Sequence, residues 1–273
     1  MFAQKEAIVK LLRDDDQRTV DLVKEELTRQ GTSAIASLQD LLAMYDERVN
    51  VHVRDVMGRI DSRHASEELG LRCSSFAENG DLEDFCWLLA RAMSPGTDAA
   101  AGRQKLDEWA AEIRQRSAAT DTPADQVRQL AQYLGGQLEF RGNVEDYYNE
   151  ENILLQSVMS TRLGIPISLT LLYMFVGARC GVRVEGINFP GHFLARHDGV
   201  LFDPFERGRI IGIPECRQIL APQKLDLQPA HLETAEPIAI AQRILANLLY
   251  VYQGNEDIEA AGRVTTWLHA LGR

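Results

Sequence analysis

The sequence has few cysteines, and none lies in a pattern that binds a metal ion. The four cysteines, Cys73, Cys86, Cys180 and Cys216, form no CxxC pair and have no metal-ligand spacing with a histidine. The sequence also lacks an HExxH motif and a glycine-rich phosphate loop, so we expect no cofactor and no metal site. Isolated thiols of this kind are typical of a reducing compartment rather than of a secreted, disulfide-bonded domain.

Positive charge is also scarce. Lysine and arginine together number 29 against 40 aspartates and glutamates, which leaves a formal net charge of −11. A protein that binds the phosphate backbone of a nucleic acid needs clustered lysine and arginine. We therefore expect no nucleic-acid partner.

Long hydrophobic runs are missing as well. The longest uncharged segment, residues 163–178, has about 16 residues, which is too short for a membrane span and includes a proline. The first residues, MFAQKEAIVKLLRDDD, lack the apolar core of a signal peptide. We expect a soluble, cytoplasmic protein with no membrane partner.

The apolar residues that are present, 45% of the chain, suffice for a large core, and most are spaced as in helices. Over residues 2–61 they form stripes at three-to-four spacing, which predicts short helices in HEAT-like hairpins without a clear repeat. Further helices are predicted at 81–92, 97–116 and 125–139, with a linker at 118–124. Two last helices, 240–252 and 257–271, predict a tetratricopeptide-like hairpin.

The segment 166–181 predicts a buried helix, because it is apolar on nearly all sides. Pro166 suits the first helical turn, and Gly181 suits a left-handed helix end. Ser168 then lies near free backbone N–H groups and the positive end of the helix dipole, where a nucleophile could be activated. The alternative, which we favour, is that Ser168 caps its own helix.

A hairpin with a histidine and an aspartate follows this helix. Asp198 and Gly199 predict a two-residue turn between strands 192–196 and 200–203. In that register His192 and Asp203 are diagonal neighbours, roughly 5–8 Å apart at Cβ, and can form a hydrogen bond. A carboxylate that orients a histidine is the back half of a nucleophile–base–acid triad. The alternative is a pair that only ties two strands together.

These motifs together resemble the SirB1 family, whose members carry a transglutaminase-like core. The resemblance runs from about residue 66 to the C-terminus. It is carried by Phe140-Arg141-Gly142-Asn143, Asp146-Tyr147-Tyr148, Asn152, Arg162-Leu163-Gly164-Ile165-Pro166-Ile167-Ser168-Leu169, Phe189-Pro190-Gly191-His192-Phe193 and Asp203-Pro204-Phe205. It implies a papain-like α+β core with a nucleophile at the start of the central helix, followed by a histidine and an aspartate on successive strands. Ser168, His192 and Asp203 occur in that order.

The sequence departs from the active enzymes of this kind at the nucleophile, which is a cysteine at the helix start. That position falls at about Pro166, and no cysteine occurs between Trp87 and Arg179. Cys180 lies at the opposite end of the helix, where the dipole would raise the pKa of a thiol. Cys216, in the first turn of a short helix after Pro214, is the remaining candidate thiol. A serine needs stronger activation than a cysteine, because almost none of it is ionised at neutral pH.

We therefore predict an α+β fold in three parts. A helical, HEAT-like region spans 1–62, and a transglutaminase-like domain spans 63–235, with a helical lead-in at 63–139 and the core at 140–220. A helical hairpin, 236–273, ends the chain.

Two classes of function are compatible with this pattern. The first is a degenerate, non-catalytic or regulatory scaffold that binds a protein or peptide partner. The second is a hydrolase or acyl transferase acting on amide or peptide bonds, with Ser168 or Cys216 as nucleophile, His192 as base and Asp203 as orienter. The absent cysteine favours the first.

Overall fold

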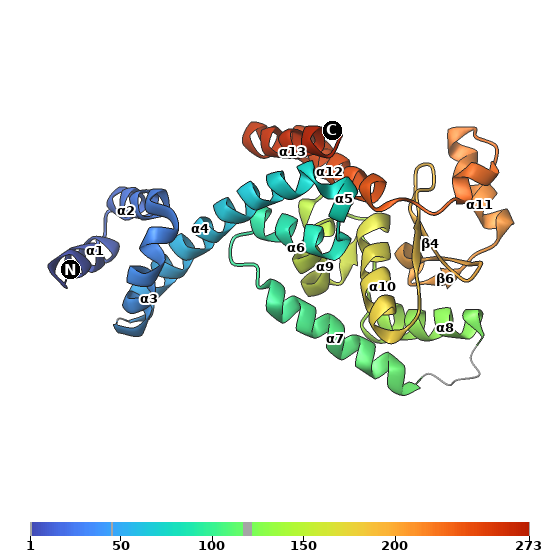
Figure 1. The fold of residues 1–273 in the computed structure, drawn as a ribbon, viewed down its shortest axis with the longest axis horizontal. Coiled ribbons are helices and arrows are strands. Elements are labelled where there is room, and N and C mark those ends of the chain that lie inside the picture. The colour runs from blue at the N-terminus through green and yellow to red at the C-terminus, as the bar shows by residue number, and fades with distance from the viewer. Residues whose placement is uncertain (1, 45, 117–121, 273) are drawn as a thin grey trace. The chain divides into compact units, whose positions relative to one another are not determined.

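The computed structural model describes residues 2–44, 46–116 and 122–272, and most of them are helical (Figure 1). The helices are α1 (Phe2–Leu12), α2 (Gln17–Gln30), α3 (Ile35–Met44), α4 (Glu47–Ser74), α5 (Phe76–Asn79), α6 (Leu82–Met93), α7 (Ala99–Arg116), α8 (Pro123–Leu130), α9 (Leu155–Thr161), α10 (Pro166–Cys180), α11 (Ile213–Leu220), α12 (Pro237–Gly254) and α13 (Ile258–Leu271). The strands are β1 (Arg141–Gly142), β2 (Leu163–Gly164), β3 (Glu185–Ile187), β4 (Leu194–His197), β5 (Val200–Asp203) and β6 (Arg209–Ile210). Within these ranges, no helix combines the length and apolarity that crossing a bilayer requires.

The chain forms two compact units, and the first comprises Met1–Leu69 and Leu88–Asp98. Its core is an apolar cluster contributed by α1, α2, α3 and α4. Helix α4 is longer than the sequence pattern predicts, because Val49, Val53, Val56 and Ile60 share one buried face at helical spacing. This shared face outweighs the strand preference of the β-branched residues at its start.

The second unit comprises Gly70–Trp87 and Ala99–Arg273, and α10 lies at its centre. Eleven residues of α10 are buried, on all sides of the helix, as its composition predicts. Helix α7 packs along it, and strands β3 and β4 contact it as well (Figure 1). Gly181 ends the helix with a left-handed φ of 81°.

The sheet beside α10 has the antiparallel order β3-β4-β5-β6. Ala195 pairs with Phe202 and Arg196 with Leu201, which confirms the predicted hairpin register. Asp198 and Gly199 both have positive φ, as a tight two-residue turn requires. His192 lies in a bend before β4 rather than within the strand.

Helix α9 ends at Thr161, and the next residue breaks the helical backbone. Arg162 takes the left-handed conformation there, with φ 66°, while Gly164 belongs to β2 and pairs in parallel with β1. A Cβ on Gly164 would lie 2.8 Å from Ser168 Oγ, so the glycine is required by close packing on α10.

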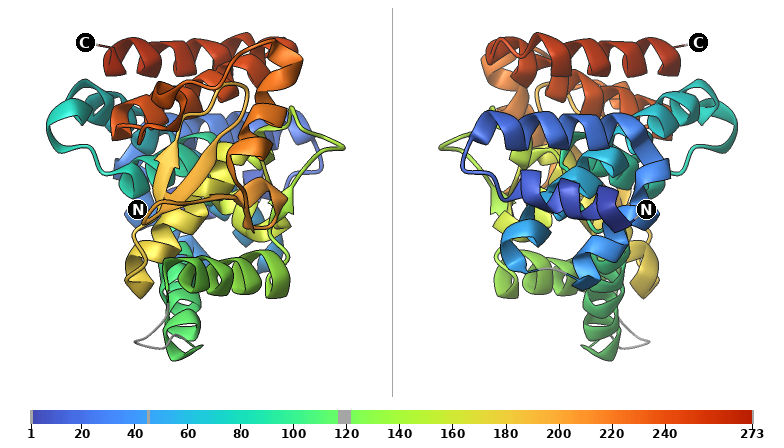
Figure 2. Two further views of the ribbon diagram at one scale, coloured as in Figure 1. Left: turned by 90° about the vertical axis from the view of Figure 1, so that its right-hand side faces the viewer. Right: turned by 90° about the vertical axis from the view of Figure 1, so that its left-hand side faces the viewer.

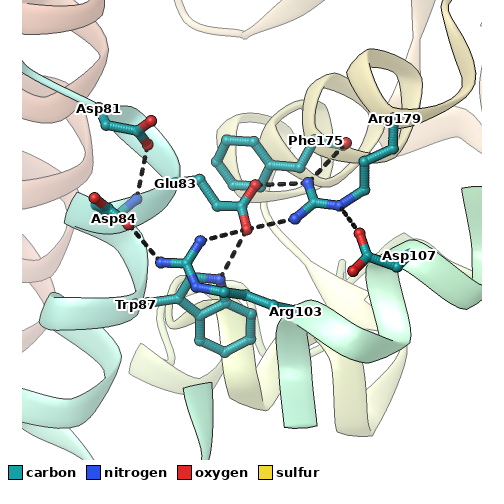
Figure 3. A network of polar contacts seen from close by, with 8 residues as sticks. All are labelled: Asp81, Glu83, Asp84, Trp87, Arg103, Asp107, Phe175 and Arg179. Atoms are coloured by element: carbon teal, nitrogen blue, oxygen red, sulfur yellow. Dashed lines mark hydrogen bonds and ion pairs between the residues drawn. The ribbon is translucent and has the colours of Figure 1, made fainter. Parts of the chain in front are cut away.

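Three helices of the second unit are joined by a network of ion pairs around Glu83 (Figure 3). Its carboxylate accepts from Arg179 of α10 at 2.6 Å and from Arg103 of α7 at 2.7 Å. Arg179 also donates to Asp107 at 2.6 Å, and Arg103 to Asp84 at 2.6 Å. Glu83 is mostly buried, and its negative charge is shared by the guanidinium groups of Arg179 and Arg103.

Helices α12 and α13 form an antiparallel pair at the end of the chain, as predicted (Figure 2). Asp257 caps α13 by accepting a hydrogen bond from the backbone N–H of Ala260. The linker predicted at 118–124 lies largely outside the described residues. The predicted three-part division and its HEAT-like and tetratricopeptide-like ends stay predictions.

The Glu83 network predicts unequal effects for two neighbouring carboxylates. We expect Glu83→Gln to lower the free energy of unfolding by about 2–3 kcal/mol, because two partly buried arginines lose their shared anion. Asp84→Asn is the control: it removes an exposed partner of Arg103 and is expected to cost at most about 1 kcal/mol. Urea unfolding of the full chain measures both, and equal losses would contradict the prediction.

Replacement of glycine by alanine is expected to change stability in opposite directions at Gly102 of α7 and Gly262 of α13. A Cβ on Gly102 would lie 2.0 Å from the Trp87 ring, whereas nothing lies within 4 Å of one on Gly262 of α13. Gly102→Ala is therefore expected to lower the melting temperature. Gly262→Ala should stabilise the chain by up to about 1 kcal/mol through helix propensity. Thermal unfolding checks both, and stabilisation by Gly102→Ala would refute the packing argument.

Candidate functional site

Ser168 is built into the start of α10, where Ile165 is the N-cap and Pro166 the first helical residue. Its hydroxyl oxygen accepts a hydrogen bond from the backbone N–H of Ile165 at 3.1 Å. The carbonyl oxygens of Asn152 and Ile165 lie 2.6 and 3.0 Å from it as acceptors for its single proton. The residue is only 2% exposed. Ser168 thus bonds to the backbone around its own first helical turn, which was the favoured alternative.

Asn152, whose carbonyl oxygen accepts from the Ser168 hydroxyl, is itself held in place by hydrogen bonds of its side chain. Its side-chain nitrogen donates to the carbonyls of Asp146 and Tyr147 at 2.6 and 3.2 Å, and its side-chain oxygen accepts from Asn143 at 3.0 Å. These contacts fold the 143–152 segment so that the carbonyl of Asn152 faces Ser168. No local pattern in the sequence indicates this role for Asn152. A buried asparagine needs several partners, and only the folded loop reveals them.

His192 and Asp203 form the predicted hydrogen bond, with Nε2 and Oδ2 2.8 Å apart. The second carboxylate oxygen accepts from the backbone N–H of Phe205 at 2.9 Å. Asp203 is 3% exposed and the His192 side chain 15%. A buried carboxylate held at both oxygens fixes the orientation of the imidazole.

Arg243 holds the backbone next to His192, a role that the sequence analysis did not identify. From α12 its guanidinium donates to the carbonyl of His192 at 2.7 Å, to that of Phe189 at 3.2 Å and to the side chain of Asn188. It also stacks over the Phe193 ring at 5.4 Å. Burial lowers the pKa of Arg243. One feature of the sequence could have indicated this role, since Arg243 is the single charged residue of the otherwise uncharged helix α12.

Aromatic side chains lead from the surface to His192, and we call Tyr148, Tyr250, Tyr147 and Phe205 the aromatic strip. Tyr148 and Tyr250 are 62% and 60% exposed, and their ring centroids are 5.0 Å apart. Tyr147 lies 5.1 Å from Tyr148 and 6.3 Å from Phe205, whose ring meets the His192 ring edge-on at 5.8 Å. Burial raises the pKa of the Tyr147 hydroxyl. The strip is continuous from the solvent to the histidine.

Cys216 lies in a different environment. It is fully buried in an apolar cluster that includes Phe189 and Leu194, and this burial raises the pKa of its thiol. A thiol of that kind is a poor nucleophile at neutral pH.

The structure therefore brings two of the three predicted site residues together. His192 bonds to Asp203, whereas in the described part of the chain no hydrogen bond joins Ser168 to His192. Among the same residues, no group of three or more histidine, cysteine or acidic side chains could hold a metal ion. The catalytic assignment of Ser168, His192 and Asp203 stays a prediction.

Comparison with known proteins agrees with this architecture. A family model described as the transglutaminase-like superfamily matches residues 100–246, which include α10, His192, Asp203 and Arg243. No solved structure matches the chain.

Curated relatives match a similar region. A UPF0162 protein of Pseudomonas aeruginosa is 34% identical over 188 residues, covering 66% of this chain and 67% of the relative. A UPF0162 protein of Xylella fastidiosa is 36% identical over 141 residues, covering 48% and 50%. Human F-box only protein 21 is 34% identical over 128 residues, covering 42% of this chain and 20% of that protein. The chain thus spans about half the length of the Xylella relative. With the family model matching more than half of it, the chain belongs to the transglutaminase-like superfamily and, within it, to the UPF0162 proteins.

Proposed function

We propose that this chain is a non-catalytic or regulatory protein of the SirB1 kind, which binds a peptide or protein partner on a degenerate transglutaminase-like scaffold. The observation that carries the proposal is the bonding of Ser168. Its hydroxyl holds the start of α10 to Asn152, so this serine, two residues after the expected cysteine position at about Pro166, serves the fold. A buried hydroxyl bonded in this way is a poor nucleophile without an adjacent base.

The aromatic strip supports a peptide as the partner. Exposed tyrosines supply large contact areas with little loss of side-chain entropy and are enriched at binding interfaces. In this chain two of them, Tyr148 and Tyr250, stand at the outer end of a strip that reaches His192. In the proposal, the His192–Asp203 hydrogen bond fixes the orientation of the His192 ring at the inner end of the strip.

One observation favours the alternative, a hydrolase or acyl transferase that acts on amide or peptide bonds. Nε2 of His192 is bonded to Asp203, and Nδ1 makes no hydrogen bond to any described residue. A histidine oriented on one side and free on the other could act as a general base for Ser168 or Cys216.

Substitution of Ser168 separates the two functions. We expect Ser168→Ala to lower the free energy of unfolding by about 1–2 kcal/mol, because a cap is lost and two buried backbone groups lose a partner. Ser160→Ala is the matched control, since the Ser160 hydroxyl is exposed on α9 and bonds only to the carbonyl of Gln156. It should change stability by less than about 0.5 kcal/mol.

The same variants are assayed for turnover of a panel of peptide amides and esters. The proposal expects the wild-type chain to show no turnover above that of His192→Ala. Turnover that both His192→Ala and Ser168→Ala abolish, with stability retained, would establish the enzyme instead.

Binding through the aromatic strip is tested with peptides selected from a displayed random library on the full chain. We expect Tyr148→Ala and Tyr250→Ala each to weaken the selected peptides about tenfold, because both remove an exposed ring from the strip. Ile258→Ala is the control, since Ile258 is an exposed apolar residue on α13, outside the strip. Peptides that bind all variants equally would exclude the strip as the docking surface.

A further inference from the structure

A groove of about 460 Å³ lies outside the candidate site, between the segment after α8 and the loop that leads into β6. Arg128, Ala131, Gln132, Gly135 and Gly136 line one wall. Residues 206–210 line the other wall. The volume is in the range of pockets that bind ligands.

The two walls are packed against each other at their base. A Cβ on Gly135 would lie 2.3 Å from the carbonyl oxygen of Arg207, and one on Gly208 would lie 2.6 Å from the Ala131 side chain. The backbone N–H of Gly208 donates to the carbonyl of Asp203 at 2.8 Å, which anchors the loop to β5. The base of the groove is therefore close-packed and preformed.

Both walls also have irregular backbones. Ala131–Gln137 forms a π-helix, a rare geometry that is frequent at functional sites. Arg207 has a left-handed φ of 57°. This backbone conformation is unfavourable for a residue with a side chain, whereas glycine adopts it freely.

Positive charge is concentrated here, although the chain has a formal net charge of −11. Three arginines and one glutamate line the groove. Arg128 is paired with Asp125 at 2.7 Å. Arg207 and Arg209 make no ion pair with any described residue, although the Glu215 carboxylate is near enough to Arg209 to interact with it electrostatically. Two guanidinium groups that form no ion pair in a preformed groove favour a ligand with carboxylates.

The chemistry of the walls favours a peptide over a small anion. Ala131, the glycines and the 38%-exposed Ile210 offer carbon surface between the arginines. Strand β6 is the edge of its sheet, and the N–H of Ile211 donates to Leu201 of β5. Backbone groups alternate along an antiparallel strand, so the N–H and C=O of Ile210 point away from β5. They are available to an extended chain.

We propose that this groove binds an acidic, extended peptide segment of a partner protein. Carboxylates of the segment pair with Arg207 and Arg209, its apolar side chains lie on Ile210 and Ala131, and its backbone bonds to Ile210. The site adds to the binding function proposed above and uses none of the aromatic strip.

The test uses the full chain and a fluorescein-labelled peptide of about eight residues, in which glutamate alternates with valine and serine. We expect binding that weakens as sodium chloride is raised, and no binding of the same peptide with lysine in place of glutamate. Arg207→Gly removes the guanidinium and keeps the left-handed backbone at lower cost. Combined with Arg209→Gln, it should weaken the peptide at least tenfold and reduce the salt dependence.

The control removes the same charge elsewhere in the second unit. Arg183→Ala with Arg217→Ala, two exposed arginines outside the groove, should leave affinity within about twofold. If both double variants weaken the peptide equally, the effect comes from the net charge of the chain and the proposal is wrong. The proposal is also wrong if Arg207→Gly with Arg209→Gln leaves peptide binding intact. If inorganic phosphate or citrate binds the groove and the peptide does not, the site is a small-anion site and the peptide proposal is wrong. These outcomes are independent of Tyr148 and Tyr250, so a failure here differs from a failure of the aromatic strip.

Discussion

The burial of α10 on all sides is the constraint on which the second unit depends. A helix with no solvent-facing side exposes no surface on which its polar groups can meet water, so neighbours must satisfy them. At the start of α10 Ser168 bonds to the backbone of Ile165 and Asn152. At its end Arg179 is held by Glu83 and Asp107 (Figure 3).

This constraint also bears on chemistry. In a papain-like arrangement the start of the central helix supplies the nucleophile, but here the hydroxyl at that place connects the helix to a folded loop. His192 and Asp203, the residues predicted as base and orienter, are nevertheless hydrogen-bonded to each other. Asp203 is held at both oxygens, and Arg243 holds the backbone of His192. The histidine is oriented by Asp203 while the serine bonds to the backbone, which is the combination on which the proposed binding function rests.

The two surfaces of the second unit that we propose bind peptides differ in their chemistry. The aromatic strip offers ring surface and ends at a histidine, whereas the groove beside β6 offers exposed arginines and a strand edge. Both take part of their walls from the segment that follows Asp203, since Phe205 belongs to the strip and Arg207 to the groove. One short segment thus positions the orienter and shapes both surfaces.

Local patterns in the sequence were sufficient for the features that depend on near neighbours. Helical periodicity predicted α10, α7 and the final helix pair, and the Asp198–Gly199 turn predicted the hairpin register and hence the His192–Asp203 bond. Contacts between distant segments could not be predicted in this way, because they depend on which backbone groups packing brings together. The partners of Ser168, the clamp formed by Arg243, the left-handed Arg162 and the groove at Arg207 are all of this kind. A serine at a helix start has the same local sequence pattern whether it caps the helix or acts as a nucleophile. The bond from Ser168 to the carbonyl of Asn152 forms only in the folded chain, because folding brings the two segments together.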